Sequence, residues 1–163
     1  MPTFHHLHLN AVDSEAAIDF YTAQFTTPAS ADQAFAYLAQ FDNTQQWDPG
    51  VSSARPLSDG PPALGSRYAV TVELGGGAEE LIYEITEYDP PRRVVLIADG
   101  RKFVSHDEIT VAADGDGAKV TYRAELSLKG LMKIGAPFAG RALRTAGDAA
   151  VAGLTRELTR LGG

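Results

Sequence analysis

The chain has 163 residues, which is enough for one domain with a hydrophobic core and too few for a second full domain. Its formal net charge of −7 argues against a nucleic-acid partner, which requires a basic face, and the absence of cysteine excludes disulfides and thiolate metal sites. No signal-like segment and no stretch of about 18 apolar residues is found, so we expect a cytoplasmic protein without stable membrane insertion.

The first segment with a recognisable pattern is 4–12, which alternates as a β-strand does. The residues that follow, 13–25, fit either a helix that begins at Asp13 or Ser14, or the approach to a strand. Local sequence does not choose between these two interpretations.

About the first 25 residues resemble the opening strand and helix of the vicinal-oxygen-chelate (glyoxalase-like) superfamily, in which the helix carries a D…AxxFY pattern. A histidine on the first strand of that superfamily can be a metal ligand. Here the resemblance ends at Thr27, and His6 and His8 share a strand face without a third ligand. We therefore predict no metal site and no cofactor.

Clearer signals begin at Pro28, which ends a strand because proline removes a hydrogen-bond donor and biases the preceding residue toward extended geometry. The segment Ser30–Gln33 has the form of a capping box and predicts a short helix after it. A turn or broken helix follows and contains Trp47, the only tryptophan. Trp47 is either a lid over the mouth of a cavity or a structural plug between helix and sheet.

Strand patterns separated by turn residues occupy the middle of the chain. The strand segments are 51–57, 66–74, 81–86, 94–98, 103–111 and 120–129. The glycine run at 75–77 lacks the helix and basic residue of a phosphate loop, and the turn at 114–117 lacks the calcium-loop pattern, so both are read as hairpin turns. Half-polar strands joined by hairpins predict an antiparallel sheet whose dry face needs a cover.

A long amphipathic helix, predicted over Leu131–Leu161, provides that cover. Its apolar residues recur every three or four positions, and the apolar stripe narrows to alanine over Ala142–Ala150. A helix that is bulky at both ends and thin in the middle leaves space beside its centre. Interior glycines such as Gly147 and Gly153 indicate close packing or a bend, or else a composition biased toward small residues.

Several phrases in this order resemble the bacterial polyketide cyclase/dehydrase and lipid-transport group of the SRPBCC, or START-like, superfamily. They are PASADQAFAYLAQFDNTQQWDPGV, ALGSRYAV, YEITEYDPPRRVVL, DEITVAADGDGAKVTYRAEL and KGLMKIGAPF. The resemblance covers residues 18–163 and implies an α+β helix-grip fold: a seven-stranded antiparallel sheet wrapped around the C-terminal helix, with two short helices after the first strand. Residues 1–17 are then an N-terminal extension. Because this fold hosts carriers, cyclases and regulators, it does not determine the function.

The inward face of the sheet and the thin helix centre predict an apolar cavity, with a solid core as the alternative. The predicted ligand-binding residues are Trp47, Tyr68, Val70, Val72, Leu81, Tyr83, Ile85, Leu96, Ile109, Tyr122, Phe138, Ala142 and Ala146. Such a cavity suits a sterol, a fatty acyl chain or an aromatic polyketide, since apolar contact supplies affinity while a few hydroxyls orient the ligand.

Candidate proton-transfer residues lie on one strand. Alternation places Ser105 and Asp107 inward and His106 and Glu108 outward, and one bulge would reverse this. His106 has the side chain whose ordinary pKa suits proton transfer near neutral pH.

The aromatase/cyclase members of the resembled group place an arginine, tyrosines and polar groups in the pocket. Here Arg67, Arg101 and Arg123 fall on predicted outer or loop positions, which speaks against cyclase chemistry.

We therefore expect a protein that binds a small hydrophobic molecule as a carrier or sensor. The alternative is a cyclase or dehydratase that works without metal, with the candidates His106, Asp107, Tyr83 and Tyr122 as proton handlers. A third possibility is a chaperone-associated or regulatory interaction module, which would have a filled core and an exposed apolar patch. The sequence identifies neither the ligand nor the oligomeric state.

Overall fold

The computed structural model describes residues 5–6, 18–74, 77–131 and 136–163, and for residues 5–6, 18–19, 74 and 136–140 it describes the backbone alone. The strands are β1 (His5–His6), β2 (Ile18–Thr27), β3 (Val51–Pro56), β4 (Arg67–Leu74), β5 (Gly77–Asp89), β6 (Arg93–Asp99), β7 (Phe103–Asp114) and β8 (Gly117–Leu128). The helices are α1 (Ala31–Ala39), the 3₁₀ helix η1 (Phe41–Asn43), α2 (Thr44–Trp47) and α3 (Ala136–Gly162). Among the described helices, none is long and apolar enough to cross a membrane.

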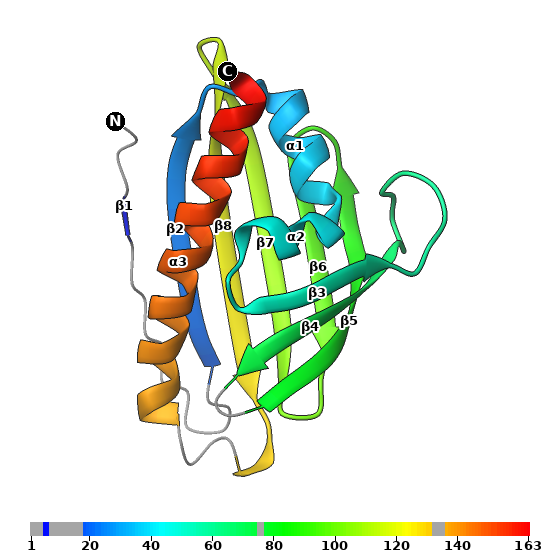
Figure 1. The fold of residues 1–163 in the computed structure, drawn as a ribbon, viewed down its shortest axis with the longest axis vertical. Coiled ribbons are helices and arrows are strands. Elements are labelled where there is room, and N and C mark those ends of the chain that lie inside the picture. The colour runs from blue at the N-terminus through cyan, green and yellow to red at the C-terminus, as the bar shows by residue number, and fades with distance from the viewer. Residues whose placement is uncertain (1–4, 7–17, 75–76, 132–135) are drawn as a thin grey trace.

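All strands belong to one antiparallel sheet with the order β1-β2-β8-β7-β6-β5-β4-β3. The sheet curls so that β3 and β4 cross the longer strands at a large angle (Figure 1). Helix α3 lies along β2 and β8, and α1 and α2 lie beside α3 on the same face of the sheet. The predicted helix-grip fold with seven strands, β2 to β8, is confirmed. The two-residue strand β1 adds to it by pairing with the edge of β2, His5 opposite Gln24.

The ambiguous N-terminal segment forms a strand where the structure describes it. β2 pairs with β8 from Ile18 to Thr27 without a break in register. Tyr21 and Phe25 are almost fully buried on its inner face. The strand interpretation is therefore correct for 18–27, and most of the predicted strand 4–12 lies outside the described residues.

Helix α1 begins as the capping box predicts. The Ser30 hydroxyl accepts a hydrogen bond from the backbone N–H of Gln33, and the Gln33 side chain accepts one from the backbone N–H of Ser30. These two bonds satisfy N–H groups that have no partner within the helix. The helix then buries Phe35 and Leu38 against the sheet, which closes one end of the sheet's dry face.

The predicted C-terminal helix is confirmed from Ala136 onward, but the prediction that Leu131 belongs to its buried stripe is wrong. α3 starts at Ala136, and Leu131, which was placed on its buried stripe, is 84% exposed. Gly130 adopts a left-handed backbone conformation (φ 52°) just after β8, which turns the chain before the helix can begin. Leu161 is also 42% exposed, so the helix is anchored by Leu154 and Leu158, both fully buried.

Two glycines of α3 lie where the helix comes close to other parts of the protein. A Cβ atom on Gly147 would lie 2.6 Å from the ring of Tyr21, and one on Gly153 would lie 2.0 Å from the carbonyl oxygen of Trp47. The close-packing interpretation of these glycines is therefore correct. The missing side chains allow α3 to approach both β2 and α2.

Candidate functional site

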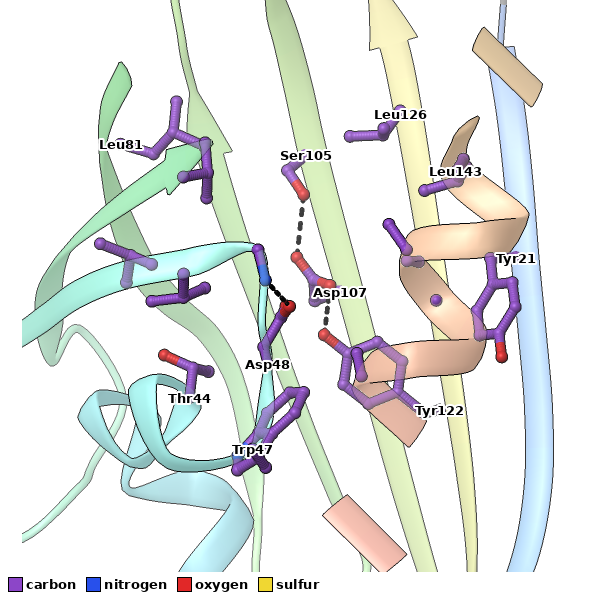
Figure 2. Close-up of a pocket in the computed structure, with 18 of the residues that line it drawn as sticks. Tyr21, Thr44, Trp47, Asp48, Leu81, Ser105, Asp107, Tyr122, Leu126 and Leu143 are labelled. Atoms are coloured by element: carbon purple, nitrogen blue, oxygen red, sulfur yellow. Dashed lines mark hydrogen bonds between the residues drawn. The ribbon is translucent and has the colours of Figure 1, made fainter. Parts of the chain in front are cut away.

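A cavity of about 140 Å³ lies between the sheet and α3. Figure 2 shows its polar centre and the surrounding aromatic and aliphatic side chains. The side chains and backbone that line it come from β2, β4, β5, β7 and β8, from η1, α2 and the start of β3, and from α3: Tyr21, Phe41, Thr44, Trp47, Asp48, Gly50, Val51, Val70, Val72, Glu73, Leu81, Tyr83, Phe103, Ser105, Asp107, Tyr122, Ala124, Leu126, Leu143, Ala146, Gly147, Ala150, Val151 and Leu154.

The space exists because the facing part of α3 has small residues. Ala146, Gly147 and Ala150 meet the cavity where a bulkier helix would fill it, and Leu154 closes the end nearer the C-terminus. The opposite wall follows from strand alternation, since residues two apart on one strand share a face. The thin helix centre predicted from the sequence thus borders a real cavity, and the solid-core alternative is wrong.

Asp107 on β7 is the polar centre of this wall. Its side chain is buried, Oδ2 accepts a hydrogen bond of 2.9 Å from the Ser105 hydroxyl, and Oδ1 accepts one of 2.6 Å from the Tyr122 hydroxyl. Burial raises the pKa of Asp107 above its usual value, although these two hydrogen bonds oppose the shift. The carboxyl is therefore held in place by the Ser105 and Tyr122 hydroxyls in a cavity with a largely apolar lining.

Asp48 approaches Asp107 from the turn between α2 and β3 (Figure 2). Its Oδ1 atom accepts a hydrogen bond of 2.8 Å from the backbone N–H of Gly50, which orients the side chain toward the cavity. Burial raises the pKa of Asp48, and the negative charge of Asp107 raises it further. The cavity thus contains two carboxyl groups that disfavour each other's ionisation.

Aromatic rings surround the two acids. Tyr83 and Phe41 pack with ring centroids 4.9 Å apart, and Trp47 meets Tyr122 edge to face at 6.0 Å. Burial, and then the nearby Asp107 carboxyl, raise the pKa of both tyrosines well above 10. Their phenols therefore remain protonated at neutral pH and can donate hydrogen bonds.

A shallow outer groove adjoins the cavity. It is lined by Pro49, Gly50, Arg141, Ala142, Thr145, Ala146 and Ala149. Gly50 and Ala146 line both the groove and the cavity, so the two spaces meet between α3 and the start of β3.

The structure brings together about half of the predicted ligand-binding residues. Those that line the cavity are Trp47, Val70, Val72, Leu81, Tyr83, Tyr122 and Ala146. Tyr68, Ile85, Leu96 and Ile109 are buried in the core outside the cavity, because alternation selects the whole dry face of the sheet and the cavity borders only part of it. Ala142 lies in the outer groove, and the Phe138 side chain lies outside the described residues.

Several residues that line the cavity were not predicted. Asp48 lies in a turn, where no periodicity indicates a direction, although the neighbouring Trp47 was a candidate. Tyr21 belongs to the segment that fitted either helix or strand, and only the strand assignment would have revealed it. Leu143 and Gly147 lie beside the alanine stripe, and a helical wheel of α3 could have found them.

The outward-facing candidates lie on the other side of the sheet. His106 and Glu108 form a shallow surface cluster with Arg123 and Glu125, and none of these four lines the cavity. Arg123 covers the ring of Phe20 at 5.1 Å.

The other two candidate arginines are also exposed. Arg67 approaches Glu84 at 3.9 Å, and Arg101 approaches Glu79 at 4.0 Å. Within the part of the chain that the structure describes, no group of three or more His, Asp or Glu residues is arranged to hold a metal ion.

Comparison with protein families gives one match. The family described as polyketide cyclase/dehydrase and lipid transport matches residues 21–161, a range that includes the strands, helices and residues that build the cavity. No curated protein sequence matches the chain.

Solved structures with the same fold include a START superfamily protein from Mycobacterium smegmatis, which is 17% identical with a TM-score of 0.69 over 87% of this chain and 98% of its own. The ZhuI aromatase/cyclase from Streptomyces sp. R1128 is 15% identical with a TM-score of 0.70, over 88% and 94%. The ginseng major latex-like protein 151 from Panax ginseng is 14% identical with a TM-score of 0.60, over 88% and 97%. At these identities the likeness concerns the fold alone.

Proposed function

Because the chain belongs to the polyketide cyclase/dehydrase and lipid-transport family, we propose that it binds a small hydrophobic molecule between the sheet and α3, as a carrier or a sensor. The observation that supports this is the cavity of about 140 Å³, bordered mostly by apolar and aromatic side chains. In such sites apolar contact provides affinity and a few polar groups orient the ligand. The binding domain in this proposal is 18–163, with 1–17 as an extension.

The volume limits the ligand. An apolar cavity of about 150 Å³ holds one benzene ring, so the enclosed part of this site fits a single ring or a short chain. A sterol-like or polyketide-like body would extend past Ala146 into the outer groove, where the two spaces meet.

Binding of toluene to the purified protein tests this proposal. Trp47 is the only tryptophan and lines the cavity, so its fluorescence reports occupancy directly. We expect a saturable fluorescence change and a higher melting temperature, because a ligand that binds only the folded state stabilises it. Ala150→Leu fills the cavity and should abolish both effects, whereas Ala149→Leu, in the outer groove, should preserve them. Absence of saturable binding by the unmodified protein would refute the proposal.

A second candidate function is a dehydratase or cyclase activity, which the buried Asp107 supports. Its carboxyl lies beside the Ser105 and Tyr122 hydroxyls, has a raised pKa, and lines the cavity, as a general acid or base must. In this candidate His106 has no part, because it faces away from the cavity.

The two functions differ in a dehydration assay. With 4-hydroxy-4-phenyl-2-butanone, a base removes the proton next to the carbonyl, an acid protonates the leaving hydroxyl, and the products are a conjugated enone and water. If the protein is an enzyme, it converts the compound to the enone, whose formation is measured by its ultraviolet absorbance. The Asp107→Asn variant should then lack this activity. A carrier binds the compound and leaves it unchanged.

A further inference from the structure

Every charged side chain that lines the cavity, among the described residues, is acidic. Asp107 and Asp48 lie at its centre and Glu73 lies at its exposed rim. Arg141 belongs to the outer groove, and His106 lies on the far face of the sheet. A ligand head that enters the cavity therefore meets acids and hydroxyls without a cation.

We propose that the cavity selects ligands whose polar head donates hydrogen bonds, a hydroxyl or an ammonium group on an apolar body, and rejects ligands whose head is a carboxylate. This inference rests on the function proposed above and specifies the ligand class for the same site.

The two acids have acceptor capacity to spare. A carboxylate offers about four lone-pair positions, and on Asp107 the Ser105 and Tyr122 hydroxyls occupy two of them, with the Tyr83 hydroxyl as a third interacting donor. On Asp48 the Oδ1 atom accepts the Gly50 N–H, and Oδ2 accepts no hydrogen bond from the described residues. A hydroxyl or ammonium head placed between the two acids can donate to both.

The charges in the cavity disfavour the binding of a ligand with a carboxylate head. Burial raises the pKa of both Asp48 and Asp107, and the negative charge of Asp107 raises the pKa of Asp48 further. A third negative group would be buried without a positive partner, which is costly. An ammonium head offsets the two acids, and the aromatic rings of Trp47, Tyr83 and Tyr122, which also line the cavity, are favourable neighbours for a cation.

Four probes with one ring and different heads test the assignment: toluene, benzyl alcohol, benzylamine and benzoate. At neutral pH benzylamine is a cation and benzoate an anion. We expect benzyl alcohol and benzylamine to bind more tightly than toluene, and benzoate to bind at least about tenfold more weakly than benzyl alcohol. Affinities are measured by Trp47 fluorescence and by calorimetry.

Two variants and one control connect this ranking to the acids. Asp107→Asn should weaken benzylamine binding about tenfold or more and strengthen benzoate binding, while toluene changes little. Asp48→Asn should act in the same direction, and it provides the answer if Asp107→Asn does not fold. Glu108→Gln removes the same charge on the opposite face of β7 and should leave all four affinities unchanged.

The outcomes separate this inference from the function on which it rests. If toluene binds and the four probes have equal affinities, or if benzoate binds as tightly as benzyl alcohol, the cavity is a ligand site but the proposed selection by the two acids is wrong. If no probe binds, the proposed function fails and the selection fails with it.

Discussion

The Tyr122 hydroxyl on β8 donates a hydrogen bond of 2.6 Å to Oδ1 of Asp107 on β7. Both side chains project from the inner face of the sheet toward the cavity (Figure 2). This hydrogen bond is the strongest influence that lowers the pKa of Asp107 against the effect of burial. Two neighbouring strands thus combine to stabilise an acid within an apolar space.

Tyr122→Phe should reduce the free energy of unfolding by about 1–3 kcal/mol, because it leaves a buried carboxyl oxygen without its donor. Urea denaturation measures the loss. Tyr68→Phe is a matched control, since the Tyr68 hydroxyl donates a longer bond of 3.4 Å to the Ala39 carbonyl and lies outside the cavity. If both variants lose the same free energy of unfolding, the hydrogen bond to Asp107 stabilises the protein no more than the bond from Tyr68 does.

Asp107→Asn should change how stability depends on pH. Because the pKa of Asp107 is raised above its usual 3.8, the folded state holds this proton more tightly than the unfolded state does. The free energy of unfolding of the unmodified protein therefore falls as pH rises from about 4 through the raised pKa, and the loss persists above it. The variant lacks this contribution, so its free energy of unfolding relative to the unmodified protein should increase from pH 4 to pH 7.

The comparison uses urea denaturation of both proteins at several pH values, because the difference cancels the titrating groups that do not interact with Asp107. Glu108→Gln, on the opposite face of β7, is the control: it measures how the pH dependence of the free energy of unfolding changes when a carboxylate outside the cavity is removed. A difference that decreases with pH for Asp107→Asn would contradict the raised pKa.

Gly153→Ala should destabilise the protein although alanine is the better helix former. The added Cβ would lie 2.0 Å from the Trp47 carbonyl oxygen, so α2 and α3 must separate. The gain in helix propensity is about 1 kcal/mol, and overpacking costs about 1–3 kcal/mol. Ala152→Gly, at an exposed position of the same helix, measures the propensity alone. A more stable Gly153→Ala protein would exclude the close contact.

Ala146→Phe should slow ligand entry, because Ala146 lies where the outer groove meets the cavity. Stopped-flow fluorescence of Trp47 after mixing with benzyl alcohol measures the association rate. Ala149→Phe adds the same ring in the outer groove alone and should leave the rate nearly unchanged. If both variants bind at the unmodified rate, the ligand enters elsewhere.

Strand alternation was a good guide to the site within regular strands. It placed Ser105 and Asp107 on the inner face and His106 on the outer face, and the structure has them there because β7 pairs with β8 without a bulge. β5 does contain an irregularity, between Ile85 and Glu87, and it lies beyond the part of β5 that lines the cavity.

Other features of the site depend on contacts that a linear pattern cannot contain. The position of Asp48 follows from a turn and from its hydrogen bond to Gly50, which no periodicity encodes. Leu131 fitted the helical stripe by spacing alone, yet the turn at Gly130 leaves it in solvent. Which residues of the dry face border empty space follows from the curl of the sheet and from the small side chains of α3.

The two halves of α3 are held to the rest of the protein unequally. Val151, Leu154 and Leu158 secure the C-terminal half in the core, while most residues from Arg141 to Ala149 are exposed or only partly covered. Backbone amides of the first half should therefore exchange with deuterium through local fraying, long before those around Leu154, which require global unfolding. A ligand in the cavity would contact both this loosely held half and the sheet, and it would slow amide exchange in that half. Hydrogen exchange would then report occupancy of the cavity residue by residue, without a fluorescent or covalent label.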